Sequence, residues 1–210
     1  MTRIFSALSV VAIALLAFTL VVGLWLGELA EPLQRSIEVR AELSVLPEDH
    51  PAREALLAEI ERIDRRLAWA NGHRLLGVAS VLAVLLVNSV SVTYFIGTSR
   101  WVREVSEAYS LGDALLRQSQ RLKRRAFPWA LTAIVAALAI AGLGAAGDPA
   151  SAVASPTMAD FHFATSLLGF PLIGWALVSQ WNRIRENHRI IDEVVAEVGE
   201  VRRERASATS

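Results

Sequence analysis

The sequence predicts an all-α integral membrane protein, a four-helix transmembrane bundle that is N-in/C-in and has helical hairpin extensions on both sides of the membrane. Three observations lead to this fold class. The 210-residue chain is 53% hydrophobic and 20% charged, its apolar residues are gathered in long uncharged blocks, and the charged segments between the blocks repeat apolar residues with helical spacing. The chain, residues 1–210, is therefore expected to form a single membrane domain.

The four transmembrane helices are expected at residues 4–26, 75–97, 127–147 and 161–181, where no Asp, Glu, Lys or Arg occurs. Each block is 21 or 23 residues long, and about 20 helical residues cross a hydrocarbon layer of about 30 Å. The first block is longer than the apolar region of a signal peptide, which has about 7–15 residues. The first block is therefore expected to remain as a membrane helix.

The distribution of charge predicts the orientation. With the N-terminus inside, residues 1–3, 98–126 and 182–210 are inner segments that together carry 14 basic and 9 acidic residues. Residues 27–74 and 148–160 are then outer segments with 7 basic and 12 acidic residues. The formal net charge of zero is thus a cancellation of +5 inside and −5 outside, and an excess of basic residues marks the cytoplasmic side.

A basic run directly before the third span strengthens this orientation and is also expected to contact anionic lipid headgroups. Its members are Arg121, Lys123, Arg124 and Arg125. Only one of the 21 basic residues in the chain is a lysine, which is typical of proteins encoded by GC-rich bacterial genomes. We therefore expect a multi-pass protein of a bacterial inner membrane with both termini in the cytoplasm.

Residues 27–74 are expected to form an outer helical hairpin that turns at residues 46–51, where two prolines interrupt the helix. Apolar stripes on the two helices of this hairpin are expected to face each other. The first stripe consists of Leu26, Ala30, Leu33, Ile37 and Ala41, and the second of Leu56, Ile60, Ile63, Leu67 and Ala70. Two ion pairs at i,i+4 spacing are expected within these helices, Glu31–Arg35 and Glu61–Arg65. Asn71 and Gly72 permit a break before the second span.

The inner side is expected to hold a second helical hairpin, residues 98–126, and a C-terminal helix, residues 182–205. The hairpin is expected to turn at residues 110–112, and Asp113 can cap the returning helix. Apolar stripes continue along all three inner helices. The tail, residues 206–210, is expected to fray.

Small and polar residues within the spans are assigned to helix packing. The third span has a small residue at every fourth position, which allows another backbone to approach closely: Ala133, Ala137, Ala141 and Ala145. Asn88 in the second span is expected to form an interhelical hydrogen bond. Gly169 and Gly174 flank Pro171, which is expected to kink the fourth span.

His73 and His162 are the candidate cofactor ligands. The predicted topology places them at similar depth near the outer boundary, on different helices, where two imidazoles could hold one b-type haem. The alternative interpretation is that both are polar interfacial residues with water-accessible tips. His50 in the outer turn and His188 in the C-terminal helix are expected to be solvated or packing residues, and no metal ligands are expected.

Composition and motifs exclude several functional classes. A net charge of zero argues against binding to nucleic acid, and the absence of cysteine excludes thiolate metal sites and cysteine nucleophiles. Spans without ionisable residues argue against a pump or proton-coupled transporter, and no catalytic motif occurs.

The leading hypothesis is a non-enzymatic accessory or scaffold subunit of a larger membrane complex that acts through helix packing, either with other membrane subunits or by self-association. The alternatives are a haem- or quinone-binding electron-transfer subunit that uses His73 and His162, and a transmembrane signalling protein.

Overall fold

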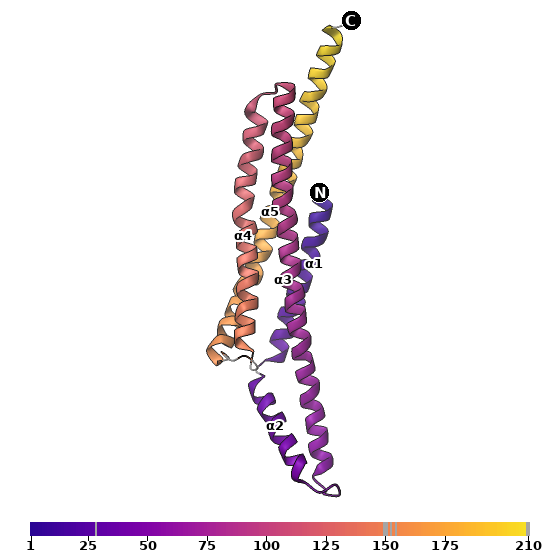
Figure 1. Ribbon diagram of the computed structural model, residues 1–210, viewed down its shortest axis with the longest axis vertical. Coiled ribbons are helices and arrows are strands. Elements are labelled where there is room, and N and C mark those ends of the chain that lie inside the picture. Colours follow the sequence, from indigo (N-terminus) through magenta and orange to yellow (C-terminus); the bar gives the residue numbers. More distant parts are fainter. Residues whose placement is uncertain (28, 149–150, 152, 154, 209–210) are drawn as a thin grey trace. The chain divides into compact units, whose positions relative to one another are not determined.

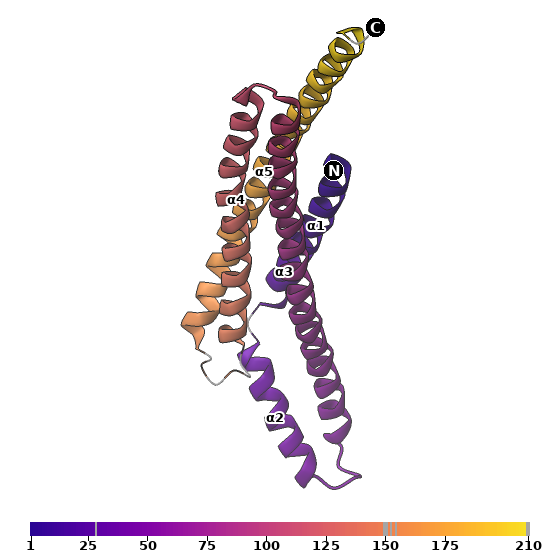
Figure 2. The same cartoon turned by 45° about the horizontal axis from the view of Figure 1, so that its top comes forward.

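The computed structural model describes residues 1–27, 29–148, 151, 153 and 155–208. Its described residues form five α-helices, and Figures 1 and 2 show them from two directions. Their bounds are α1 Thr2–Leu26, α2 Ala30–Val45, α3 Arg53–Tyr109, α4 Asp113–Gly147 and α5 Pro156–Ala208.

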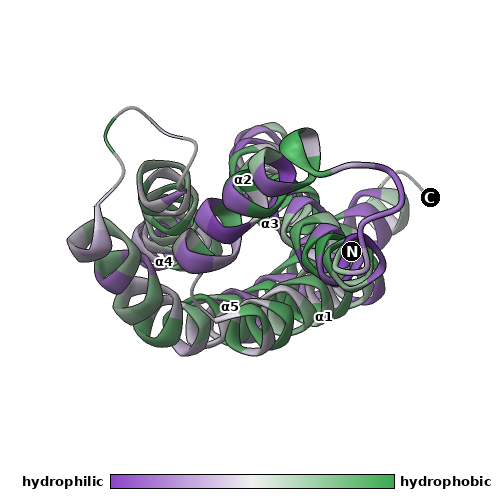
Figure 3. Cartoon of the chain, turned by 90° about the horizontal axis from the view of Figure 1, so that it is seen from below, coloured by the Kyte–Doolittle hydropathy of each residue, from purple (hydrophilic) through white to green (hydrophobic). Residues whose placement is uncertain are grey.

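Four of these helices, α1, α3, α4 and α5, are each long and apolar enough to cross a membrane. Large apolar side chains on them are exposed at the protein surface, for example Leu75 and Leu168, each with 73% of its surface accessible. Such exposure is unfavourable in water and favourable in lipid. By contrast, α2 is a mixed helix, on which Figure 3 shows both hydrophilic and hydrophobic residues. The predicted all-helical character and the four helices of spanning length are confirmed.

Packing divides the chain into two units, each built from segments of α1, α3, α4 and α5. Unit 1 comprises residues 1–13, 82–139 and 168–210. Unit 2 comprises residues 14–81 and 140–167 and therefore also contains α2.

In unit 2, α2 lies antiparallel to the first part of α3, and we call this hairpin, residues 30–70, the arm (Figures 1 and 2). Two ion pairs join its helices: Arg35 to Glu59, with Nε 2.7 Å from Oε1, and Arg40 to Asp64, with Nη2 2.8 Å from Oδ1. At the turn, Arg53 donates hydrogen bonds to backbone carbonyls at the end of α2, those of Leu43 and Leu46. The two helices of the arm are thus joined at the turn and by ion pairs between their middle parts.

The apolar stripe predicted for the α3 side of the arm faces α2: Ile60 and Ala70 are buried, and the other three members are partly buried. On the first stripe Leu26 is buried and Leu33 is partly buried, but the prediction is wrong for Ile37 and Ala41, which are exposed. The face of α2 that is turned inward instead contains the buried residues Ser36 and Val39, and the side chain of Ala30 lies outside the described residues.

A break between α1 and α2 explains this error. Gly27 ends α1 with a backbone φ of +59°, a left-handed conformation that glycine adopts without steric cost. Because the helix is interrupted there, the rotational phase of the first span does not continue into α2. Of the two predicted ion pairs, Glu61–Arg65 is present. The ion pairs that the structure describes for Arg35 are with Glu38, Glu42 and Glu59 and not with the predicted partner Glu31.

Three further expectations concern where the helices break, turn and end. α3 continues without interruption through Asn71 and Gly72, where the sequence permits a break. The turn predicted at residues 110–112 is present between α3 and α4, with Ser110 at a φ of 57°. α5 extends to Ala208, beyond the expected end of the C-terminal helix at residue 205, and residues 209–210 of the expected tail lie outside the described residues.

Candidate functional site

The two candidate haem ligands lie next to each other in unit 2. His73 comes from α3 and His162 from α5, 89 positions later in the chain. Their ring centroids are 6.4 Å apart, and the ring planes are inclined by 76°. We call these two side chains the histidine pair.

Each histidine packs against a glycine of a further helix. A Cβ atom added to Gly23 of α1 would lie 2.9 Å from Cε1 of His73, and one added to Gly144 of α4 would lie 2.9 Å from Cε1 of His162. Cβ atoms do not approach other heavy atoms this closely, so only glycine leaves room for these rings. The histidine pair therefore sits where segments of α1, α3, α4 and α5 meet within unit 2.

Hydrogen bonding differs between the two rings. Nδ1 of His162 is 3.0 Å from the carbonyl oxygen of Ile140, which lies four positions before Gly144 in α4. Nδ1 of His73 is buried and has no hydrogen-bond partner among the residues that the structure describes.

The other two histidines lie elsewhere. Nδ1 of His50 accepts a hydrogen bond from the backbone N–H of Ala52 in the turn of the arm, and His188 is exposed on α5. Within the described part of the chain, no three His, Asp or Glu side chains are grouped so that they could hold a metal ion.

A second polar cluster lies in unit 1 and joins α3 to α5. Nε2 of Gln180 donates a hydrogen bond of 2.8 Å to Oδ1 of Asn88, and both residues are completely buried. Nδ2 of Asn88 donates to the carbonyl of Val84 in its own helix. Asn88 therefore forms an interhelical hydrogen bond, of the kind that the sequence favours.

Asn187, also completely buried, is the centre of a larger network in the same unit. Its Nδ2 donates to the hydroxyl oxygens of Tyr94 and Thr98, at 3.1 and 3.0 Å, and its Oδ1 accepts from Ser119 at 3.4 Å. Asn187 of α5 thus connects α3 and α4 through side chains alone.

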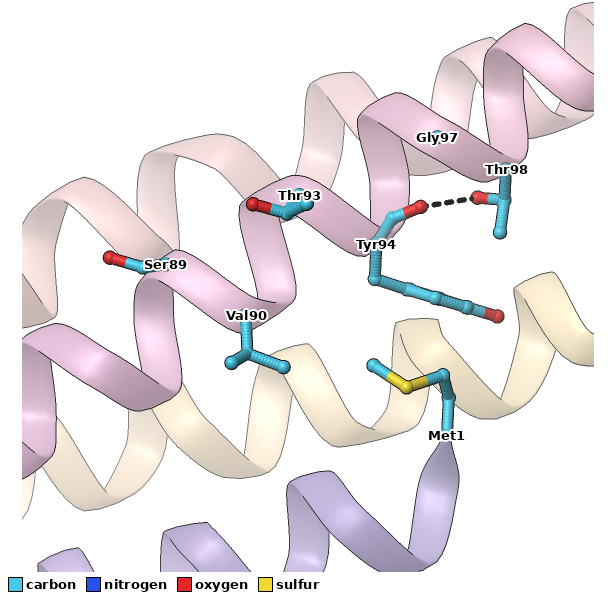
Figure 4. A pocket seen from close by; sticks show the side chains of 7 residues that line it. All are labelled: Met1, Ser89, Val90, Thr93, Tyr94, Gly97 and Thr98. Atoms are coloured by element: carbon cyan, nitrogen blue, oxygen red, sulfur yellow. Dashed lines mark hydrogen bonds between the residues drawn. The ribbon is translucent and has the colours of Figure 1, made fainter.

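A recess of about 490 Å³ lies beside this network. Figure 4 shows its lining, in which the Tyr94 side chain extends toward Met1 and the hydroxyl of Thr98 donates to the backbone carbonyl of Tyr94. The side chains that line it are apolar or carry a hydroxyl group.

The other predicted site residues are spread over α4 and α5. The small-residue stripe of α4 is buried at Ala133 and Ala137, partly buried at Ala141 and exposed at Ala145. Gly169 is buried and Gly174 partly buried. In the basic run, Arg121, Arg124 and Arg125 are exposed, and Lys123 is partly buried.

Sequence reasoning missed the residues that complete both clusters. Gln180 and Asn187 are seven positions apart on α5, a spacing that puts them on one helix face. This spacing is the feature of the sequence that indicates a shared polar contact. Gly23 and Gly144 carry no comparable signal, because which glycine meets a neighbouring helix depends on how each helix is rotated.

Comparisons with protein-family models, curated proteins and solved structures found no match for this chain.

Proposed function

We propose that this protein is a non-enzymatic integral membrane protein that works through protein–protein contact, as an accessory or scaffold subunit of a larger membrane complex. The observation that carries the proposal is an apolar stripe on the outward face of α2. It consists of Ile37, Ala41 and Val45, and 64% of the Ile37 surface and 80% of the Val45 surface are exposed. Spacing of four residues is the spacing that helix–helix packing uses.

The proposed orientation places the arm in water. Both termini lie in the cytoplasm of a bacterium, the four spans cross its inner membrane, and the arm is in the periplasm, in keeping with the excess of basic residues in the segments assigned to the inside. In this position lipid does not cover the stripe on α2. An apolar surface exposed to water is better covered by another protein, and the occupant we propose is a helix of a partner subunit.

Ion pairs make the arm a suitable platform for such a contact. The Arg35 guanidinium donates hydrogen bonds to both carboxylate oxygens of Glu59. These hydrogen bonds hold the pKa of the Glu59 carboxyl below its ordinary value, so the pair is charged at neutral pH. Arg40 and Asp64 form a second ion pair between the same two helices, so that charged contacts hold α2 against α3.

Site-specific photocrosslinking tests this function with a matched pair of alanines. Ala41 lies on the apolar outward face of α2, whereas Ala58 is also exposed but lies among charged residues on α3. A photoreactive residue at position 41, in cells that express the protein at its natural level, is expected to give a discrete adduct with one membrane protein. The same residue at position 58 is expected to give none.

The mass of the adduct identifies the partner as a second copy of this chain or as a different subunit. An arginine at position 41 should prevent co-purification of that partner, since a charge on the apolar stripe must then be desolvated, whereas an arginine at position 58 should not. Equal crosslinking at the two positions, or none at either, would contradict the proposal.

A further inference from the structure

We infer that a recess between α1 and α5 in unit 1 binds the phosphate headgroup of an anionic phospholipid. The recess has a volume of about 370 Å³. It is lined by Thr2, Arg3, Ser6 and Ala7 of α1 and by Trp181 of α5, and we call it the α1–α5 recess. Its lining combines a guanidinium, two hydroxyl groups and an indole, and it includes no carboxylate.

The α1–α5 recess lies at the end of two apolar blocks. Arg3 directly precedes the uncharged residues 4–26, and Trp181 is the last of the uncharged residues 161–181. In a membrane-spanning helix, the end of the apolar stretch lies where hydrocarbon gives way to headgroups, a level at which tryptophan is enriched. Within one turn of the recess in the same blocks, Ile4 and Val178 expose 57% and 51% of their surface. A lipid with its phosphate in the recess therefore has apolar side chains beside its acyl chains.

Three polar side chains of the lining are available to a phosphate. Among the described residues, no ion pair engages the Arg3 guanidinium and no hydrogen bond engages the hydroxyls of Thr2 and Ser6. Hydroxyls within helices often donate to the carbonyl four positions earlier, as those of Ser80 and Thr98 do here. An arginine binds a phosphate through two parallel N–H donors, and each hydroxyl can donate one more hydrogen bond. The lining therefore offers donors to an anion without a competing negative charge.

Arg185 brings a second guanidinium to the edge of the α1–α5 recess. Its Cζ lies 4.7 Å from the centroid of the Trp181 ring. Stacking on an indole uses the face of a guanidinium and leaves its N–H donors, which lie in its plane, available for an anion. In the arm, by contrast, Arg35 and Arg40 are paired with carboxylates. The α1–α5 recess thus has an excess of positive charge that an anion neutralises.

The surroundings of the recess favour an anionic phospholipid as its occupant. A soluble phosphate gains only from the polar lining, whereas a phospholipid also covers the exposed side chains of Ile4 and Val178 with its acyl chains. A zwitterionic lipid carries its own cation close to the phosphate, so two arginines without carboxylates favour a headgroup with a net negative charge. Phosphatidylglycerol has such a headgroup and is the probe for this site.

Native mass spectrometry of the full-length protein in a neutral detergent tests the inference, because it counts the lipids that stay bound to each chain. With phosphatidylglycerol we expect one lipid to bind more tightly than any that follow, and with phosphatidylcholine no such lipid. Arg3→Gln and Arg185→Gln should each weaken this first binding step about fivefold, as expected for one basic residue at a membrane surface. Arg203→Gln is the matched control and should leave it unchanged, because Arg203 is an exposed arginine of the same helix, about 27 Å beyond Arg185.

A second measurement locates the lipid in the wild-type protein. Phosphatidylglycerol with a photoreactive headgroup, in nanodiscs of phosphatidylcholine, should crosslink preferentially to residues 1–7 and to the segment around Trp181, as peptide mapping of the adducts would show. Equal binding of phosphatidylcholine, or an equal loss in Arg203→Gln and Arg3→Gln, would overturn the inference. So would adducts confined to other segments, or displacement by inorganic phosphate as effective as that by short-chain phosphatidylglycerol, which would mark a site for a free anion.

Discussion

Gly144→Leu is expected to lower the free energy of unfolding by about 1–3 kcal/mol, the usual cost of overpacking a filled site. A side chain at position 144 must enter the space that the His162 ring occupies, because the first added carbon would already lie 2.9 Å from Cε1. The imidazole must then turn away and lose its hydrogen bond to the carbonyl of Ile140. Denaturant titration in detergent, followed by circular dichroism, measures this loss.

Two further variants show whether the cost arises from this contact. Gly142 lies two residues away on α4, and a Cβ at that position meets no described atom within 4 Å; Gly142→Leu should therefore be nearly neutral. The double variant Gly144→Leu/His162→Ala should recover most of the lost stability, because the leucine then fills the volume of the missing ring. Contacting residues of this kind show non-additive effects. If Gly144→Leu and Gly142→Leu have equal effects, the described packing is wrong.

The second large effect is expected at Asn187. Asn187→Leu removes three side-chain hydrogen bonds and leaves the hydroxyls of Tyr94, Thr98 and Ser119 without this partner. Leaving buried polar groups unpaired costs about 1–3 kcal/mol. We expect a decrease of this size in the free energy of unfolding, together with faster hydrogen exchange in the adjoining parts of α3 and α4, measured by mass spectrometry.

Asn182 supplies the matched control, since it is an asparagine of the same helix that is exposed to the surroundings. Asn182→Leu should change stability by no more than about 0.5 kcal/mol, as is usual for surface substitutions. A similar loss for the two variants would show that the network around Asn187 does not hold α5 against α3 and α4.

The sequence was sufficient to predict the helices that could span a membrane, because length and the absence of charge depend only on local composition. The sequence also predicts that His73 and His162 lie at similar depth in the membrane, because each lies close to the end of an apolar block. These properties follow from distance along the chain, and a helix converts that distance into height at about 1.5 Å per residue.

Helix rotation could not be predicted in the same way. Ile37 and Ala41 of α2 were assigned to the wrong face because the left-handed conformation of Gly27 interrupts the helix before α2. The contacts of Gly23 and Gly144 with the histidine pair likewise depend on which face of α1 and α4 is turned inward. Tertiary packing decides this, and an apolar span that is hydrophobic on all sides gives little indication of it.

The proposed orientation puts the arm and the two chain termini on opposite sides of the membrane. Because the chain contains no cysteine, single cysteines can be introduced directly: Ala58→Cys on the exposed face of α3 in the arm, Arg203→Cys near the end of α5 and Leu168→Cys within a span. With a membrane-impermeant maleimide, spheroplasts should label Ala58→Cys at once, Arg203→Cys only after lysis, and Leu168→Cys under neither condition. Labelling of Arg203→Cys in intact spheroplasts, or protection of Ala58→Cys until lysis, would contradict the proposed orientation.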